Sequence, residues 1–174
     1  MSYREVYEFW KDNPEGFWMD AAKAADWYTD PSVALDDSKA PMYGWFADAS
    51  CNICHNALDR HVEAGHGDRT AIIYDSPVTG SKAQLTYADT LDAVARLAGA
   101  LAEKGVVKGD RVIIYMPMVP EALVAMLACA RLGAIHSVVF GGFAAPELAV
   151  RINDATPKAI IASSCGIEPG RIVE

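Results

Sequence analysis

A few short stretches of the chain hold residue types and spacings that could do chemistry. Cys51-x-x-Cys54-His55 has the spacing of covalent haem attachment and, with His61 or His66, resembles part of a zinc site. No second Cys-x-x-Cys supports zinc, and no export signal of the kind that accompanies such haem precedes it. We therefore expect Cys51 and Cys54 to be packing thiols on one helix face, and we assign no metal ligand.

Two further polar stretches favour structural roles. Residues 79–82, Thr-Gly-Ser-Lys, resemble half of a phosphate-binding loop, but an earlier glycine and a following helix are missing. A hairpin turn is predicted there. Asp59, Arg60 and His61 are adjacent on a predicted helix, where neighbours point in different directions, so a solvated face or a local salt bridge is expected. We recognise no nucleophile–base pair and assign no catalytic residue.

A glycine pair, Gly141-Gly142, ends the apolar run from Ile135 to Phe140. Glycine lets a ligand approach the backbone closely, and a helix that starts next presents free N–H groups to anions. Ligands of open α/β sheets bind beyond the carboxyl ends of the strands. A plain tight turn would use the same two glycines, so spacing alone leaves both interpretations open.

The elements that must position this pair alternate between strand and helix. Strands are predicted at Val112–Ile114, Ile135–Phe140 and Lys158–Ala162, and the helices between them begin at Pro120 and Pro146. The strands are continuously apolar, which is typical of parallel sheets covered on both faces. The expected fold is α/β, with a partial doubly wound βαβαβ parallel sheet.

A helix, a β-hairpin and a second helix are predicted before this unit. Thr86 and Asp89 have capping-box spacing at the start of the second helix, which Gly105 ends. The other predicted ranges are a helix over Ser50–Glu63 and strands over Thr70–Asp75 and Ala83–Thr86.

The first 46 residues hold all four tryptophans and eleven of the sixteen aromatic residues. Because these rings alternate with Asp, Pro and Gly, we predict an irregular aromatic-rich leader, residues 1–49, that packs on a main domain. That domain begins at residue 50 and runs to residue 174.

The composition excludes several classes of protein. A net charge of −8 argues against nucleic-acid binding and against a basic membrane surface. No apolar run is long enough to span a bilayer. The expected location is cytoplasmic, and the four cysteines are expected to be free thiols.

Taken together, these segments resemble the N-terminal part of short-chain, AMP-forming acyl-CoA synthetases, in the acetyl-/propionyl-CoA synthetase branch of the adenylate-forming enzymes. The resemblance covers essentially the whole chain. It is carried by Asn13–Trp18 with Trp27, Cys54–His61, Leu85–Asp89, Gly109–Met118 and Gly133–Phe143.

The resemblance implies a ligase in which a carboxylate attacks ATP, giving an acyl-adenylate and pyrophosphate, before CoA displaces AMP. ATP with Mg²⁺, CoA and a short-chain carboxylate are then the small-molecule partners, and none is expected to bind these residues tightly. The carried-over CoA contacts are Phe140, Gly141, Gly142, Glu168, Gly170 and Arg171. Acetyl-CoA synthetases have an arginine where this chain has Glu168, and Ser163–Arg171 is more similar to the propionyl-CoA enzymes.

Residues 50–174 would then be the first part of an AMP-binding (adenylation) domain. The ATP loop, the Mg²⁺-binding glutamate and the catalytic lysine of such enzymes have no counterpart here. We therefore expect a truncated, inactive fragment that could self-associate through its sheet edge. The alternative is a stand-alone regulatory module that binds CoA or an adenine nucleotide.

Overall fold

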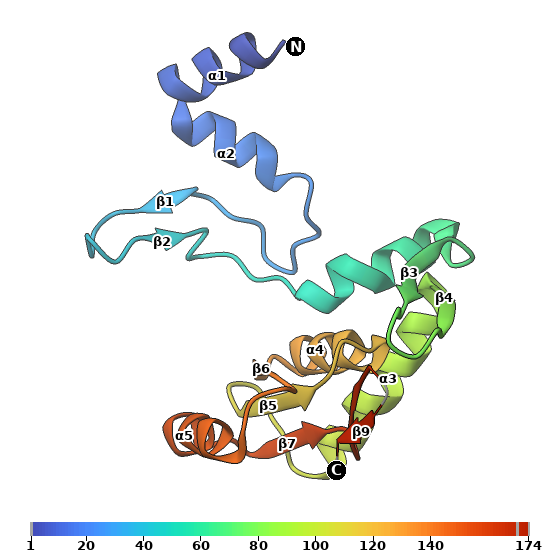
Figure 1. Ribbon diagram of the computed structural model, residues 1–174. Helices are drawn as coiled ribbons and strands as arrows, with labels where there is room; N and C mark the ends of the chain where they lie inside the picture. Colours follow the sequence, from blue (N-terminus) through green and yellow to red (C-terminus); the bar gives the residue numbers. More distant parts are fainter. Residues whose placement is uncertain (1, 170, 174) are drawn as a thin grey trace. The chain divides into compact units, whose positions relative to one another are not determined.

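The structure, a computed structural model, describes residues 2–169 and 171–173 and divides the chain after Asn52 into two units (Figure 1). The first unit holds helices α1 (Tyr3–Asp12) and α2 (Pro14–Ala22) and a two-stranded antiparallel pair, β1 (Leu35–Asp36) and β2 (Gly44–Trp45). The second unit holds all the remaining elements.

The leader predicted as irregular is helical over much of its first half, so that prediction was wrong there. Both helices begin at polar caps. The Ser2 hydroxyl accepts from the N–H of Glu5, whose carboxylate accepts from the N–H of Ser2. The Asn13 side chain accepts from the N–H of Gly16. These caps satisfy N–H groups that a helix start leaves without partners, which explains why helices form among so many aromatic residues.

The aromatic rings of the first unit contact one another but do not form a buried core. Phe17 meets Trp18 edge-on at 5.2 Å between centroids, and Trp18 meets Trp45 at 5.3 Å. Among the described residues of this unit only Ala22 and Ala34 are buried. Packing of the leader on the main domain stays a prediction.

A three-stranded parallel sheet forms the centre of the second unit, as the sequence predicts. Its strands are β5 (Arg111–Met116), β6 (Ile135–Phe140) and β7 (Ala159–Ala162), in the order β6-β5-β7. Helix α4 (Pro120–Leu132) connects β5 to β6, and α5 (Ala145–Ala155) connects β6 to β7. Figure 1 shows β5 and β7 as arrows that point the same way.

Strand β5 is buried on both of its faces. Val112, Ile113 and Ile114 have no exposed surface, and successive side chains of a strand point to opposite faces. This confirms the prediction of cover on both faces for the central strand. The prediction was wrong for the outer strands, because β6 leaves Ile135 and Val138 exposed and β7 leaves Ile160 exposed. At the start of the strand, the Arg111 Nε–H donates to the carbonyl of Ala155 at 2.9 Å, which joins the end of α5 to the sheet.

The predicted hairpin and capped helix are present. Strands β3 (Thr70–Asp75) and β4 (Lys82–Thr86) pair antiparallel, and α3 (Tyr87–Glu103) follows. The Thr86 hydroxyl accepts from the N–H of Asp89 at 3.1 Å, and Asp89 accepts in return from the N–H of Thr86. Residues 79–82 lie in and after the hairpin turn, where Gly80 has φ 69°, so the hairpin prediction is confirmed.

The first helical segment of this unit differs from the predicted range Ser50–Glu63. Helical geometry begins at Ile53 and includes two π-helical stretches, η1 (His55–Asp59) and η2 (Val62–His66). The helical geometry continues past the predicted end at Glu63, and Gly65 lies within η2 at φ 80°. Cys51 therefore precedes the helix and is exposed, whereas Cys54 is fully buried. The prediction that both thiols share a packing face was wrong for Cys51.

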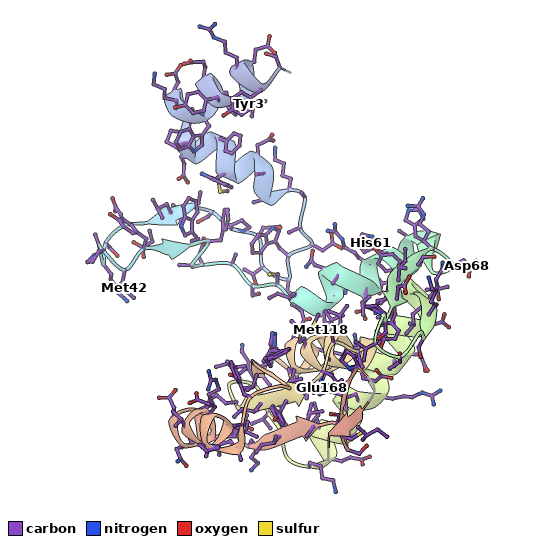
Figure 2. All side chains as sticks on the ribbon, viewed as in Figure 1. Tyr3, Met42, His61, Asp68, Met118 and Glu168 are labelled. Carbon is purple, nitrogen blue, oxygen red and sulfur yellow. The ribbon has the colours of Figure 1, made fainter. Side chains whose placement is uncertain are left out.

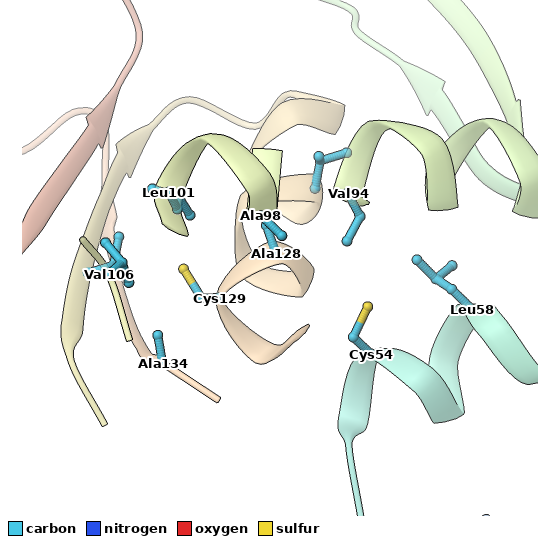
Figure 3. Close-up of a cluster of buried hydrophobic side chains, with 11 residues drawn as sticks. Cys54, Leu58, Val94, Ala98, Leu101, Val106, Ala128, Cys129 and Ala134 are labelled. Carbon is cyan, nitrogen blue, oxygen red and sulfur yellow. The ribbon is translucent and has the colours of Figure 1, made fainter. Parts of the chain in front are cut away.

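Helices α3 and α4 and the segment that starts at Ile53 enclose an apolar core beside the sheet (Figure 3). Figure 3 shows Cys54 and Leu58 directed towards the side chains of α3. The buried members of the core are Cys54, Leu58, Val94, Ala98, Leu101, Val106, Val112, Val124, Ala128, Cys129 and Ala134. The residues that α3 contributes, Val94, Ala98 and Leu101, have the three- to four-residue spacing of one helix face.

A short antiparallel pair, β8 (Gly166–Glu168) and β9 (Arg171–Val173), follows β7. The sequence analysis did not predict it. Over the described residues, no helix combines the length and the apolar character that crossing a membrane requires.

The two buried thiols are expected to make stability depend on alkaline pH. Burial raises the pKa of Cys54, an effect that the Arg131 guanidinium opposes, and burial alone raises the pKa of Cys129. The folded state therefore holds these protons more tightly than the unfolded state. That stabilisation is complete below the ordinary thiol pKa of 9.0 and is lost as pH rises through the raised values.

In urea unfolding between pH 8 and pH 10, each thiol is expected to contribute a loss of up to about 1.4 kcal/mol per pH unit above that pKa. Cys129→Ala should flatten the slope, and Cys51→Ala is the matched control at an exposed thiol. Equal slopes in the wild type and Cys129→Ala would contradict the prediction.

Candidate functional site

The glycine loop, which we define as Phe140 to Phe143, lies at the carboxyl end of the parallel sheet. Phe140 is the last residue of β6 and lies in register with Met116, the last residue of β5. The N–H of Phe143 donates to the carbonyl of Phe140 at 3.0 Å, which closes a turn. Helix α5 starts at Ala145, and its cap residue Ala144 supplies no side-chain hydrogen bond. The predicted strand–glycine–helix order is confirmed.

Gly141 is a glycine because the chain's own backbone covers it. A Cβ at this position would lie 2.9 Å from the carbonyl carbon of Met116 and 3.0 Å from the nitrogen of Pro117. Neither atom can move without shifting the end of β5. An added Cβ therefore does not fit at Gly141, which gives this glycine a role in internal packing. Contact of its backbone with CoA stays a prediction.

Gly142 makes room for an aromatic ring. A Cβ at this position would lie 2.6 Å from Cε1 of Phe140, an atom at the far end of a side chain that can rotate away. Alanine here would therefore displace the ring more readily than the backbone. The two glycines thus have separate roles, one in the turn and one beside the Phe140 ring.

An exposed aromatic pair and a cation accompany the loop. The Phe140 ring is 61% exposed and meets the Phe143 ring edge-on, with centroids 6.0 Å apart. The Arg151 guanidinium of α5 lies 4.6 Å from the centroid of Phe143, and its Nη1 lies 3.3 Å from Oε2 of Glu147. An exposed ring face with a nearby cation suits a base ring that carries a phosphate.

The second predicted stretch, Glu168 to Arg171, lies in the β8–β9 pair. Glu168 ends β8, is exposed (labelled in Figure 2) and pairs in register with Arg171 at the start of β9. Gly170 lies outside the described residues, and of Arg171 only the backbone is described. Convergence of this stretch with the glycine loop therefore stays a prediction.

An ion pair that the sequence analysis did not predict links two elements. It joins α4 to the helical segment that starts at Ile53. Arg131 Nη1 lies 2.9 Å from both carboxylate oxygens of Asp59 and 3.7 Å from the Cys54 sulfur. Asp59 was expected to face solvent or to pair locally, but its partner is 72 residues away, and only 15% of its side chain is exposed. Nothing in the sequence around Arg131 or Asp59 indicates that the two side chains pair.

Metal-ligating side chains do not converge in the part of the chain that the structure describes. No group of three His, Cys, Asp or Glu residues there could hold a metal ion. We assign no step of any reaction to a metal ion.

Comparison with known sequences identifies the family. The model of the family described as AMP-binding enzyme matches residues 58–172, and that of the acetyl-coenzyme A synthetase N-terminus matches residues 3–57. The chain belongs to the AMP-binding enzyme family, and the predicted resemblance is confirmed.

Three relatives illustrate the likeness. Over 93% of its length the chain is 56% identical to the bovine protein named acyl-CoA synthetase short-chain family member 3, mitochondrial, and covers 24% of it. It is 51% identical to acetyl-coenzyme A synthetase of Streptomyces avermitilis, with 96% of the chain and 26% of the relative covered. An uncharacterized Pseudomonas aeruginosa protein is 53% identical over the whole chain, which covers 28% of it. The chain thus spans about a quarter of the length of these curated relatives.

Proposed function

We propose that the chain is the N-terminal part of an AMP-forming acyl-CoA synthetase, which joins a short-chain carboxylate to CoA at the expense of ATP. The likeness of the whole chain to acyl-CoA and acetyl-CoA synthetases carries this proposal. The carboxylate attacks the α-phosphorus of ATP and releases pyrophosphate. The CoA thiol then attacks the acyl carbon of the adenylate, and AMP leaves.

In this proposal the glycine loop contributes to the binding of the CoA nucleotide. Phe140 offers an exposed ring for stacking, and Gly142 keeps the space beside that ring open. Glu168, Gly170 and Arg171 are the proposed contacts of the second stretch, with Arg171 as the cation for a phosphate. We propose no catalytic residue among the 174 residues.

The strand order supports a doubly wound sheet. From β5 the chain moves to β6 on one side and then crosses back to β7 on the other. Because such crossovers are almost always right-handed, the reversal puts α4 and α5 on opposite faces. Ligands bind where strand order reverses, beyond the carboxyl ends of the strands, and the glycine loop follows the carboxyl end of β6, beside β5.

The finer points of the proposal concern the acid, the location and assembly. Propionate is the proposed acid, because Ser163–Arg171 is more similar to the propionyl-CoA enzymes. A cytoplasmic location stays a prediction, since one relative is named as mitochondrial. The third parallel strand, β7, lies at an edge of the sheet and exposes Ile160, which supports self-association of the isolated residues through this edge.

The test separates adenylation from CoA binding. In the complete polypeptide that contains these residues, Arg171→Ala is expected to leave propionate-dependent ATP–pyrophosphate exchange unchanged. The same variant should raise the KM for CoA about ten- to a hundredfold, because a charge-assisted hydrogen bond to phosphate is lost. Arg96→Ala, which removes an exposed arginine of α3, is the matched control.

Two results would contradict the proposal. One is exchange activity in a preparation of residues 1–174 alone, since we propose no adenylating residue there. The other is a KM for CoA that stays at the wild-type value in Arg171→Ala. Faster exchange with acetate than with propionate would correct only the proposed acid.

A further inference from the structure

A hydrogen bond joins the central strand of the sheet to the glycine loop. The hydroxyl of Tyr115, near the end of β5, donates to the carbonyl of Phe143 at 2.6 Å. The two residues are 28 positions apart. The bond therefore anchors the loop to a different element and does not belong to the loop's own turn.

The ring that carries this hydroxyl is itself fixed by the sheet. Tyr115 lies in register between Val139 of β6 and Ala162 of β7. Val139 is almost fully buried, and Tyr115 shares a face of the sheet with the buried Ile113 two residues earlier. A half-buried ring between two neighbours has few alternative positions, so its hydroxyl stays where the loop needs it.

The loop has few other anchors. Ala144 provides no side-chain cap, and Gly142 and Phe143 are exposed. A loop that exposes its backbone and buries little apolar surface opens easily. Its second anchor is the close approach of Gly141 to the backbone of Met116 and Pro117, which also belongs to the end of β5.

Fixing Phe143 also fixes the ring that a ligand would meet. The Phe143 ring stands edge-on to Phe140 and carries the Arg151 guanidinium. If the backbone of Phe143 moves away, its ring no longer contacts the Phe140 ring or the Arg151 guanidinium. The hydrogen bond from Tyr115 to the Phe143 backbone therefore also fixes the position of the Phe143 ring.

We propose that Tyr115 is a positioning residue that holds the glycine loop ordered, before ligand binding, in the form that the CoA nucleotide meets. The inference rests on the proposed function. A loop that is already ordered loses less conformational entropy on binding, so the affinity for the ligand is higher. Because the hydrogen bond is exposed to water, its effect on global stability is small compared with its effect on the loop.

The test is Tyr115→Phe in the complete polypeptide, which removes only the hydroxyl. Without ligand, the amides of Gly142 and Phe143 are expected to exchange hydrogen about three- to tenfold faster, from the loss of one hydrogen bond. The KM for CoA should rise by a similar factor, while propionate-dependent ATP–pyrophosphate exchange and the Tm stay near wild type. Tyr74→Phe, in strand β3, is the matched control and should change none of these quantities.

The outcomes separate this inference from the proposed function. Unchanged amide exchange and an unchanged KM for CoA in Tyr115→Phe would overturn the positioning role, even if Arg171→Ala behaves as expected. Faster loop exchange in a protein that shows no CoA-dependent reaction would refute the proposed function and support the ordering of the loop by Tyr115. Should the Tm of Tyr115→Phe fall substantially, the tyrosine has a general structural role and the inference fails.

Discussion

Replacing Gly141 with alanine is expected to lower the free energy of unfolding by about 1–3 kcal/mol. The new methyl group would lie within 3.0 Å of three backbone atoms of Met116 and Pro117. Backbone cannot rotate out of the way as a side chain can, so β5 and β6 must separate at their carboxyl ends. The same separation moves the Phe143 carbonyl away from the Tyr115 hydroxyl. We therefore also expect a higher KM for CoA in the complete polypeptide.

Two further glycines provide matched controls for chemical unfolding. Gly142→Ala meets only the movable Phe140 ring and should cost less stability than Gly141→Ala. Gly99 lies in α3 with nothing within 4 Å of an added Cβ. Because alanine favours helix, Gly99→Ala should stabilise the protein by up to about 1 kcal/mol. If Gly141→Ala is as stable as the wild type, the end of β5 does not approach Gly141 as closely as the structure shows.

Truncating Ile113 to alanine is expected to cost about 2–5 kcal/mol of unfolding free energy. Ile113 is fully buried in the central strand, with Ser137 and Ile160 beside it in register. Its side chain points to the face opposite Val112, which belongs to the core around α3 and α4. The cavity would therefore form on the face of the sheet opposite that core. The decrease in unfolding free energy measures how well this face is covered.

Ile160→Ala is the matched control for this cavity. Ile160 is an isoleucine on the same face and in direct register, but it is 46% exposed. Its truncation should cost at most about 1.5 kcal/mol, because much of the side chain is already in water. Equal losses at the two positions in urea unfolding would contradict the view that β5 is buried on both faces.

Local patterns in the sequence predicted the central sheet well. Pro120 and Gly133 mark the ends of α4, and the run from Ile135 to Phe140 matches β6 residue for residue. These signals act over a few residues: proline fits a first helical turn, and glycine takes the left-handed conformation at the end. The capping pair of Thr86 and Asp89 is equally local, and it too was predicted.

The features that the sequence did not reveal depend on contacts between distant segments. Asp59 looked like a surface residue because its partner, Arg131, is 72 positions away. The packing role of Gly141 was not predicted, because nothing near it in the sequence shows that Met116 and Pro117 approach it. Helix α1 differs, because its signal is local: Ser2 and Glu5 form a capping box, but the dense aromatic residues among Asp, Pro and Gly favour an irregular segment.

The order of the strands also bears on how the sheet assembles. The central strand is made first, and its two neighbours follow on opposite sides. Ile113 pairs with Ser137 and later with Ile160, so the second pairing closes about twice the length of chain. A doubled loop adds only about 0.6 kcal/mol of closure entropy. The pairing of β7 with β5 is therefore hardly disfavoured at equilibrium. During synthesis, however, one side of β5 stays unpaired until β7 has been translated.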